Sequence, residues 1–174
     1  SSGKEMTSDF YPARAESAPL TFRVKAAKAS DSMLRINEVV AENKSVAKDQ
    51  QGDFDDYIEI VNTSGSKIDL SGKFLTDDTK NPRKWKFPKG THIGAGEHLI
   101  IWADENGNAK GGLHANFKLD KAGETIQLID RDSDGNLILD EIKFAKLGTD
   151  QAFRRIPDAK GAPSPGKPSP GKKN

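Results

Sequence analysis

Apolar and polar residues alternate in several short stretches along the middle of the chain. In the clearest of them, Ile58 and Ile60 flank Glu59. Successive side chains of a β-strand point to opposite faces of a sheet, so this alternation predicts half-buried strands. The other stretches with the same pattern are residues 34–36, 68–70, 85–87 and 126–128.

Two stretches depart from strict alternation. Residues 39 and 40 are both valine, and the pair breaks the register of the first stretch, as a β-bulge does. Residues 99–102 are apolar throughout, which is typical of a strand covered on both faces. A last candidate strand contains Phe153 and Ile156 and ends at Pro157.

Turn signals separate these stretches. Gly and Asn cluster at residues 94–96, 105–108 and 122–123, and no segment places apolar residues at helical spacing over three turns. Many short strands joined by such turns predict an all-β chain that folds as an antiparallel β-sandwich.

The two ends of the chain differ from the middle in composition. Residues 1–32 show no sustained period, and we expect a linker or the end of a preceding region there. Residues 159–174 are rich in Pro, Gly, Ser and Lys, and they contain Ser-Pro-Gly-Lys twice, at 164–167 and 169–172. We expect this segment to be a flexible, disordered tail, and the folded domain to span residues 33–158.

Charge and cysteine content narrow the function classes. Residues 33–158 contain 18 Lys and Arg against 22 Asp and Glu, whereas residues 159–174 contain 4 Lys and no acidic residue. A mildly acidic body argues against a broad nucleic-acid-binding face. The chain has no Cys, which excludes disulfides, thiolate metal ligands and thiol nucleophiles. The sequence shows no signal peptide and no membrane-spanning apolar segment, and a chain that begins Ser1-Ser2-Gly3 is expected to be part of a longer protein.

Residues 130–141 match the calcium-binding loop of an EF-hand. Asp130, Asp132 and Asp134 stand at its first, third and fifth positions. Gly135 and Glu141 follow at the sixth and twelfth. An EF-hand loop needs a helix on each side, but the flanking residues alternate as strands do. We therefore favour a β-hairpin without a dedicated metal, and weak Ca²⁺ binding at its tip is the alternative.

A second acidic cluster precedes the strand that contains Ile58. It consists of Asp49, Asp53, Asp55 and Asp56. Carboxylates this close together repel one another unless a cation or solvent screens them, so one interpretation is a Ca²⁺-binding loop. We favour the other, a solvated surface loop. Of the two clusters this one is the better metal candidate, because it is not tied to hairpin geometry.

Residues 80–89 combine basic and aromatic side chains. Arg83, Lys84, Lys86 and Lys89 could neutralise phosphates while a neighbouring ring stacks on a base. The rings alternate with the lysines, however, which favours a strand with its rings in the core and its ammonium groups in water. A polyanion contact is the alternative, to which the basic residues 159–174 would add weak attraction.

The sequence contains no catalytic or nucleotide-binding signature. His92, His98 and His114 do not have the spacing of zinc ligands, and no Gly-x-Ser-x-Gly elbow or Walker loop occurs. We therefore expect a protein that is not an enzyme and requires no cofactor, with Ca²⁺ as the one metal candidate.

A series of short motifs follows one another between residues 33 and 158. They are INEV at 36–39, DYIEIVN at 56–62, IDLSG at 68–72, FLTDD at 74–78, WKFPKGTHI at 85–93, GEHL at 96–99, ANFKL at 115–119, GET at 123–125 and RRIPD at 154–158. Their order resembles the lamin tail domain family of immunoglobulin-like modules, and SPGKKN at 169–174 resembles the motif that closes the family's sequences. Tyr57 is a departure, since the family usually has Trp there.

The resemblance implies an immunoglobulin-like fold and a module for recognition or tethering, with no shared catalytic residues. Bacterial members are often attached to secreted or surface proteins. This implies a binding module of a larger bacterial protein, extracellular or at the cell surface, with a protein or cell-surface partner. The alternatives are a weak DNA- or polyanion-binding module and a calcium-stabilised accessory domain of a secreted hydrolase.

Overall fold

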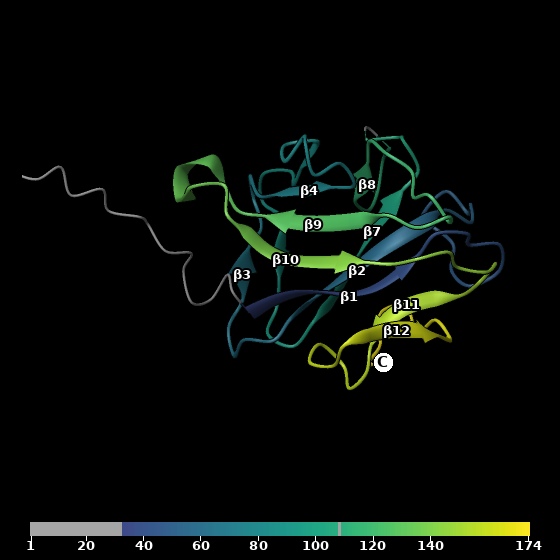
Figure 1. The fold of residues 1–174 in the computed structure, drawn as a ribbon. Helices are drawn as coiled ribbons and strands as arrows, with labels where there is room; N and C mark the ends of the chain where they lie inside the picture. Colours follow the sequence, from purple (N-terminus) through teal and green to yellow (C-terminus); the bar gives the residue numbers. More distant parts are fainter. Residues whose placement is uncertain (1–32, 108) are drawn as a thin grey trace, which may run out of the picture.

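The protein is a β-sandwich in which two larger sheets pack against each other (Figure 1). The computed structural model describes residues 33–107 and 109–174, so the linker predicted at residues 1–32 lies outside the described residues. Within the described residues the regular elements are strands and short 3₁₀ turns, without an α-helix. The prediction of an all-β, immunoglobulin-like sandwich is confirmed.

The larger sheet has six strands, and all its neighbouring pairs are antiparallel except β7 and β8, which are parallel. In spatial order the strands are β12 (Pro163–Gly166), β11 (Ala152–Arg155), β1 (Leu34–Val40), β2 (Asp56–Asn62), β7 (His98–Ala103) and β8 (His114–Ala115).

The second sheet has four antiparallel strands, and a two-stranded sheet stands beside it. The four are β10 (Ile138–Lys143), β9 (Thr125–Ile129), β4 (Phe74–Thr76) and β5 (Trp85–Lys86); the two are β3 (Ile68–Asp69) and β6 (His92–Ile93). A short 3₁₀ helix, η2 (Asp132–Asp134), connects β9 to β10. The Ile36 amide donates to Asp140 Oδ2 at 2.7 Å, which joins β1 to β10 and so links the two larger sheets.

The main core lies between these sheets, where the alternation predicted it. Ile58 and Ile60 are fully buried in one apolar cluster with Leu128. Trp85 and Phe87 are also buried there, with their ring centroids 4.7 Å apart in an edge arrangement, while the lysine between them is exposed. The prediction of rings in the core is confirmed, whereas the Lys84 ammonium is half-buried in an ion pair with Asp77 rather than free in water.

The opposite face of β2 is buried as well. Tyr57 forms a second, smaller apolar cluster with Val40, Trp102 and Ala152. Glu59 lies on the same face of the strand and has no exposed surface. Apolar and polar residues alternate along β2, yet both faces of the strand are buried. Another part of the chain must therefore cover its outer face.

The bulge in β1 lies earlier than the pair Val39-Val40 indicated. The register with β2 shifts between Ile36 and Glu38, so Asn37 is the additional residue. Because of this shift Glu38 stands directly opposite Glu59 on the neighbouring strand.

The C-terminal segment is ordered, which differs from the flexible tail expected for residues 159–174. Residues 163–166 form β12 against β11, and Ser169 and Gly171 donate backbone hydrogen bonds to buried carboxylates. Composition indicated disorder because the segment has few apolar side chains to bury. The segment is ordered by backbone hydrogen bonds, and amino-acid composition does not predict these bonds. In the structure the folded unit therefore continues to Asn174, past the predicted boundary at 158.

None of the helices among the described residues has the length and apolar character needed to cross a membrane.

Candidate functional site

A shallow groove lies where β1 ends and β2 begins. We call it the end groove. Its volume is about 380 Å³, and it separates the segment 41–56 from residues 118–121. Its charged and aromatic lining comes from Glu42, Lys44, Phe54, Asp55, Asp56, Lys118, Asp120 and Lys121.

Asn43 fixes the shape of the loop beside the groove. Its side-chain oxygen accepts a hydrogen bond from the Val46 amide at 3.0 Å, and its amide nitrogen donates to the carbonyls of Ala47 and Asp55 at 2.6 and 2.8 Å. The side chain is buried, so these bonds replace those that water would make. The hydrogen bonds of the Asn43 side chain therefore fix the backbone of the loop beside the groove.

The four aspartates of the first acidic cluster do not converge on one point. Asp49 caps a turn, since its Oδ1 accepts from the amides of Gln51 and Asp53 at 2.9 and 2.8 Å. Asp56 accepts from the Asn43 amide at 3.3 Å. Throughout the described ranges, no group of three or more His, Asp or Glu side chains is placed to hold a metal ion.

Burial and mutual repulsion act on the two aspartates that line the groove. Burial raises the pKa of Asp56, and burial together with the nearby carboxylates of Asp104, Asp49 and Asp53 raises the pKa of Asp55. Across the groove, Lys121 bonds Glu42 at 2.8 Å, and this hydrogen bond lowers the pKa of Glu42. The groove thus carries both signs of charge within a small area.

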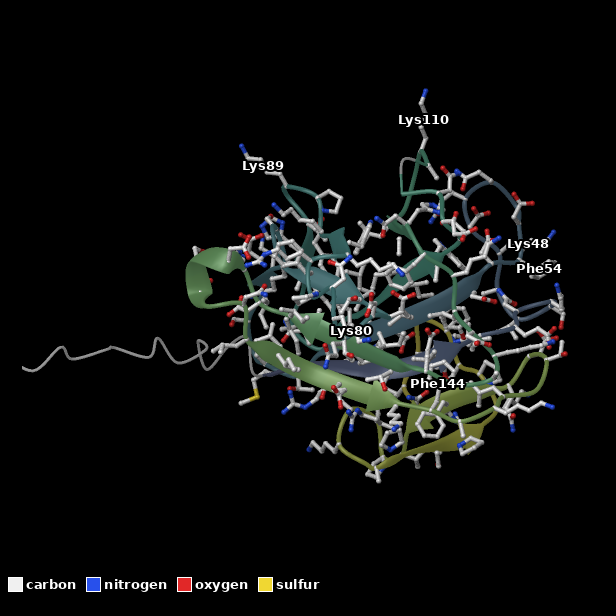
Figure 2. The ribbon with its side chains drawn as sticks, turned by 45° about the horizontal axis from the view of Figure 1, so that its top comes forward. Lys48, Phe54, Lys80, Lys89, Lys110 and Phe144 are labelled. Atoms are coloured by element: carbon white, nitrogen blue, oxygen red, sulfur yellow. The ribbon has the colours of Figure 1, made fainter. Side chains whose placement is uncertain are left out.

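Phe54 borders the groove with an exposed aromatic ring. The side chain is 39% exposed, and Lys48 Nζ lies 4.8 Å from the ring centroid. Figure 2 shows both side chains at the right-hand edge of the molecule. Aromatic side chains, phenylalanine among them, are enriched at the cores of protein interfaces.

The second acidic cluster forms the tip of a hairpin, as the flanking alternation indicated. β9 and β10 pair on either side of η2, and Gly135 and Asn136 both have positive φ. Each aspartate of the cluster contacts a cationic side chain. Asp130 pairs with Lys73 at 2.7 Å, Asp132 with Arg83, and Asp134 with Arg131 at 3.6 Å.

The basic run is largely engaged within the fold. Lys84 pairs with Asp77 at 2.7 Å and lies over the Phe117 ring, while Lys86 lies over the Phe74 ring. Arg83 holds Asp132, as described above. Lys89 instead projects from the molecule into solvent (Figure 2).

The three histidines lie apart, each with a local partner. His92 Nδ1 contacts the Gly90 carbonyl at 2.6 Å, and His98 Nε2 contacts Asp158 at 3.2 Å. His114 bridges Asp104 and the Gly111 carbonyl, both at 2.8 Å. These contacts bind loops to strands.

Sequence reasoning missed the buried carboxylates Glu38 and Glu59. The signal was present, since Glu59 alternates with Ile58 and Ile60 and therefore shares a face with Tyr57. A half-buried strand would turn this face to solvent, but the C-terminal segment covers it.

Comparison with known proteins agrees with the fold. No curated protein matches the chain significantly. A sequence model described as Lamin Tail Domain matches residues 27–146, more than half of the chain. Members of this family are immunoglobulin-like and generally non-catalytic. The chain belongs to the lamin tail domain family.

Proposed function

We propose that this domain is a non-catalytic binding or tethering module of a larger protein, and that it contacts a protein partner through the end groove. The family supports the class of function. The bacterial origin of the larger protein and its location outside the cytoplasm are part of the proposal, and they rest on the family resemblance.

The observation that carries the choice of surface is the exposed ring of Phe54 beside a groove of mixed charge. Large apolar side chains are costly to leave in water, and aromatic rings supply much of the energy of protein interfaces. The surrounding carboxylates and lysines suit a partner segment that carries both charges, because such pairs fix the register of docking.

Affinity capture with cross-linking, from an extract of the source organism, tests this function. We expect a protein captured by the wild-type chain to be lost with Phe54→Ala. The matched control is Ile138→Ala, which removes a side chain that is 57% exposed at the start of β10. Retention of the same protein by the Phe54→Ala chain would contradict the proposed surface.

A weak polyanion contact is the second candidate. Lys89 and Lys110 both project from the same side of the molecule in Figure 2. Such a contact would depend strongly on salt, because it rests on charge alone. A gel shift that is absent even at low salt would exclude it. For the third candidate, a calcium-stabilised accessory domain, the ion pairs at the hairpin tip are unfavourable.

A further inference from the structure

Glu38 and Glu59 form a buried pair of carboxylates on the outer face of the six-stranded sheet. They are register partners on β1 and β2, and neither side chain is exposed. Like charges directly across a strand pair are destabilising, and buried carboxylates need strong donors. In the described part of the chain neither glutamate forms an ion pair with lysine or arginine.

Neutral donors surround the pair instead, and the C-terminal segment supplies several of them. The Ser169 amide donates to Glu38 Oε2 at 3.0 Å. The Gly171 amide donates to Glu59 Oε2 at 2.6 Å. The remaining donors belong to the sheet itself, the Tyr57 hydroxyl to Glu38 and the Asn37 amide to Glu59.

Asn174 provides a third point of attachment. Its side chain donates to the Asn37 carbonyl at 3.1 Å, and its backbone amide donates to Asp158 at 3.1 Å. It also accepts a hydrogen bond of 2.6 Å from the Ser169 hydroxyl, which closes the segment into a compact turn. Ser169, Gly171 and Asn174 therefore each form their own hydrogen bonds with the rest of the domain.

The sheet, rather than local propensity, selects this shape. Gly171 adopts φ +72°, a conformation that other residues rarely take, although a Cβ would meet no atom within 4 Å. The first Ser-Pro-Gly-Lys copy, at 164–167, has the same residues but runs through the extended strand β12. Its Gly166 is not among the glycines with positive φ. One motif thus takes two conformations, and only the second copy contacts the carboxylates.

We propose that Asn37, Glu38 and Glu59 form a peptide-binding site selective for a Ser-Pro-Gly-x-x-Asn segment. The chain's own residues 169–174 occupy the site in cis, and the same segment of a second copy binds it in trans and joins two molecules. Covalent attachment gives the cis segment an effective concentration on the order of millimolar. The trans contact forms when the cis segment is released.

Binding of a synthetic peptide tests the site. The peptide carries residues 167–174 with a fluorophore, and its anisotropy is measured against the Gly171→Val chain, whose own segment is strained by a branched residue at positive φ. We expect saturable binding, and affinity at least about tenfold weaker for the wild-type chain, where the site is occupied. The matched control peptide carries the same Gly171→Val change and should bind at least about tenfold more weakly too.

Equal affinity for the two peptides, or no saturable binding to the Gly171→Val chain, would overturn the proposal. If that chain lacks the circular dichroism of the wild type, the milder Gly171→Ala chain takes its place in the same comparison.

Mixing two variants tests the joining of copies. The Gly171→Val chain keeps its site but loses its segment, while a Glu59→Gln chain keeps its segment and weakens its site. The glutamine offers one oxygen where Asn37 and Gly171 require two. Light scattering should show a one-to-one dimer only in the mixture. Monomers in the mixture, at concentrations where the peptide binds, would overturn the trans contact.

Discussion

Lys73 and Asp130 form an ion pair of 2.7 Å in which both side chains are fully buried. Removing one partner of such a pair leaves an uncompensated charge in the interior. We expect Asp130→Asn to lower the free energy of unfolding by about 3–5 kcal/mol, measured by urea denaturation.

The matched control is Asp132→Asn, two residues away. Asp132 pairs with Arg83, but both side chains of that pair are more than half exposed, so its loss should change stability little. Similar losses for the two variants would contradict a special role for the buried pair.

The titration of Glu59 makes the stability of the folded protein depend on pH. Burial, with a contribution from Glu38, raises its pKa to about 7, even though Asn37, the Gly171 amide and His98 act in the opposite direction. The folded state therefore binds more protons than the unfolded state between about pH 4.5 and 7. This contribution to stability is fully present below pH 4.5 and is lost as the pH rises through 7.

We accordingly expect the urea midpoint of the wild-type chain to fall between pH 5 and pH 8, and Glu59→Gln to reduce that fall. Burial also raises the pKa of Glu124 to about 7. Glu124→Gln is therefore the control that accounts for the remaining slope. A Glu59→Gln chain with the full wild-type slope would show that this carboxyl titrates outside the range.

The hairpin of β9, η2 and β10 illustrates how context decides the meaning of a motif. Its loop matches the EF-hand pattern residue by residue, yet strands flank it, and its carboxylates contact Lys73, Arg83 and Arg131. A Ca²⁺ ion would have to displace these cations before it could bind. We expect the melting temperature to be the same in millimolar CaCl₂ and in excess chelator. A saturable rise with Ca²⁺, absent in an Asp132→Asn chain, would contradict this.

How far each element could be predicted depends on what stabilises it. The strands around Ile58 and Trp85 follow from alternation, because apolar burial leaves a period of two in the sequence. β12 contains no Leu, Ile, Val or aromatic side chain, so it leaves no such period. Two of its four residues are proline, which also removes donors from the outermost strand of the sheet and so discourages pairing with other chains.

The candidate site was predictable only in part for a related reason. The sequence shows a cluster of acidic residues before β2. It does not show that this loop lies beside residues 118–121, because only the tertiary fold brings the two segments together. The Glu59 partner at Gly171 is 112 residues away along the chain. Local sequence patterns contain no information on a contact of that separation, so they do not predict that the glutamate is buried.

At the scale of the whole molecule, the C-terminal segment completes the fold. The predicted domain ends at residue 158 and the family match ends at 146, yet β12 extends the larger sheet beyond β11, and residues 169–174 cover the outer face of β1 and β2. We expect a chain truncated after Asp158 to lose about 3 kcal/mol or more of unfolding free energy, because buried carboxylates lose their donors. A thermal melt and a urea titration measure this directly. Unchanged stability would mean that the segment is dispensable.

Replacing both glutamates, in the full-length chain and in the truncated chain, separates two effects of the truncation. One is the loss of hydrogen bonds to the carboxylates, and the other is the repulsion between them. In the full-length chain, Glu38→Gln with Glu59→Gln removes acceptors that Ser169 and Gly171 need, so it should destabilise. In the truncated chain those donors are absent, and the same double substitution relieves the repulsion of two adjacent carboxylates, so it should stabilise. This reversal of sign, measured by urea denaturation of the four chains, is expected only if the segment acts through the glutamates. If the double substitution had the same effect in both backgrounds, the segment would have to stabilise the sandwich through β12 alone.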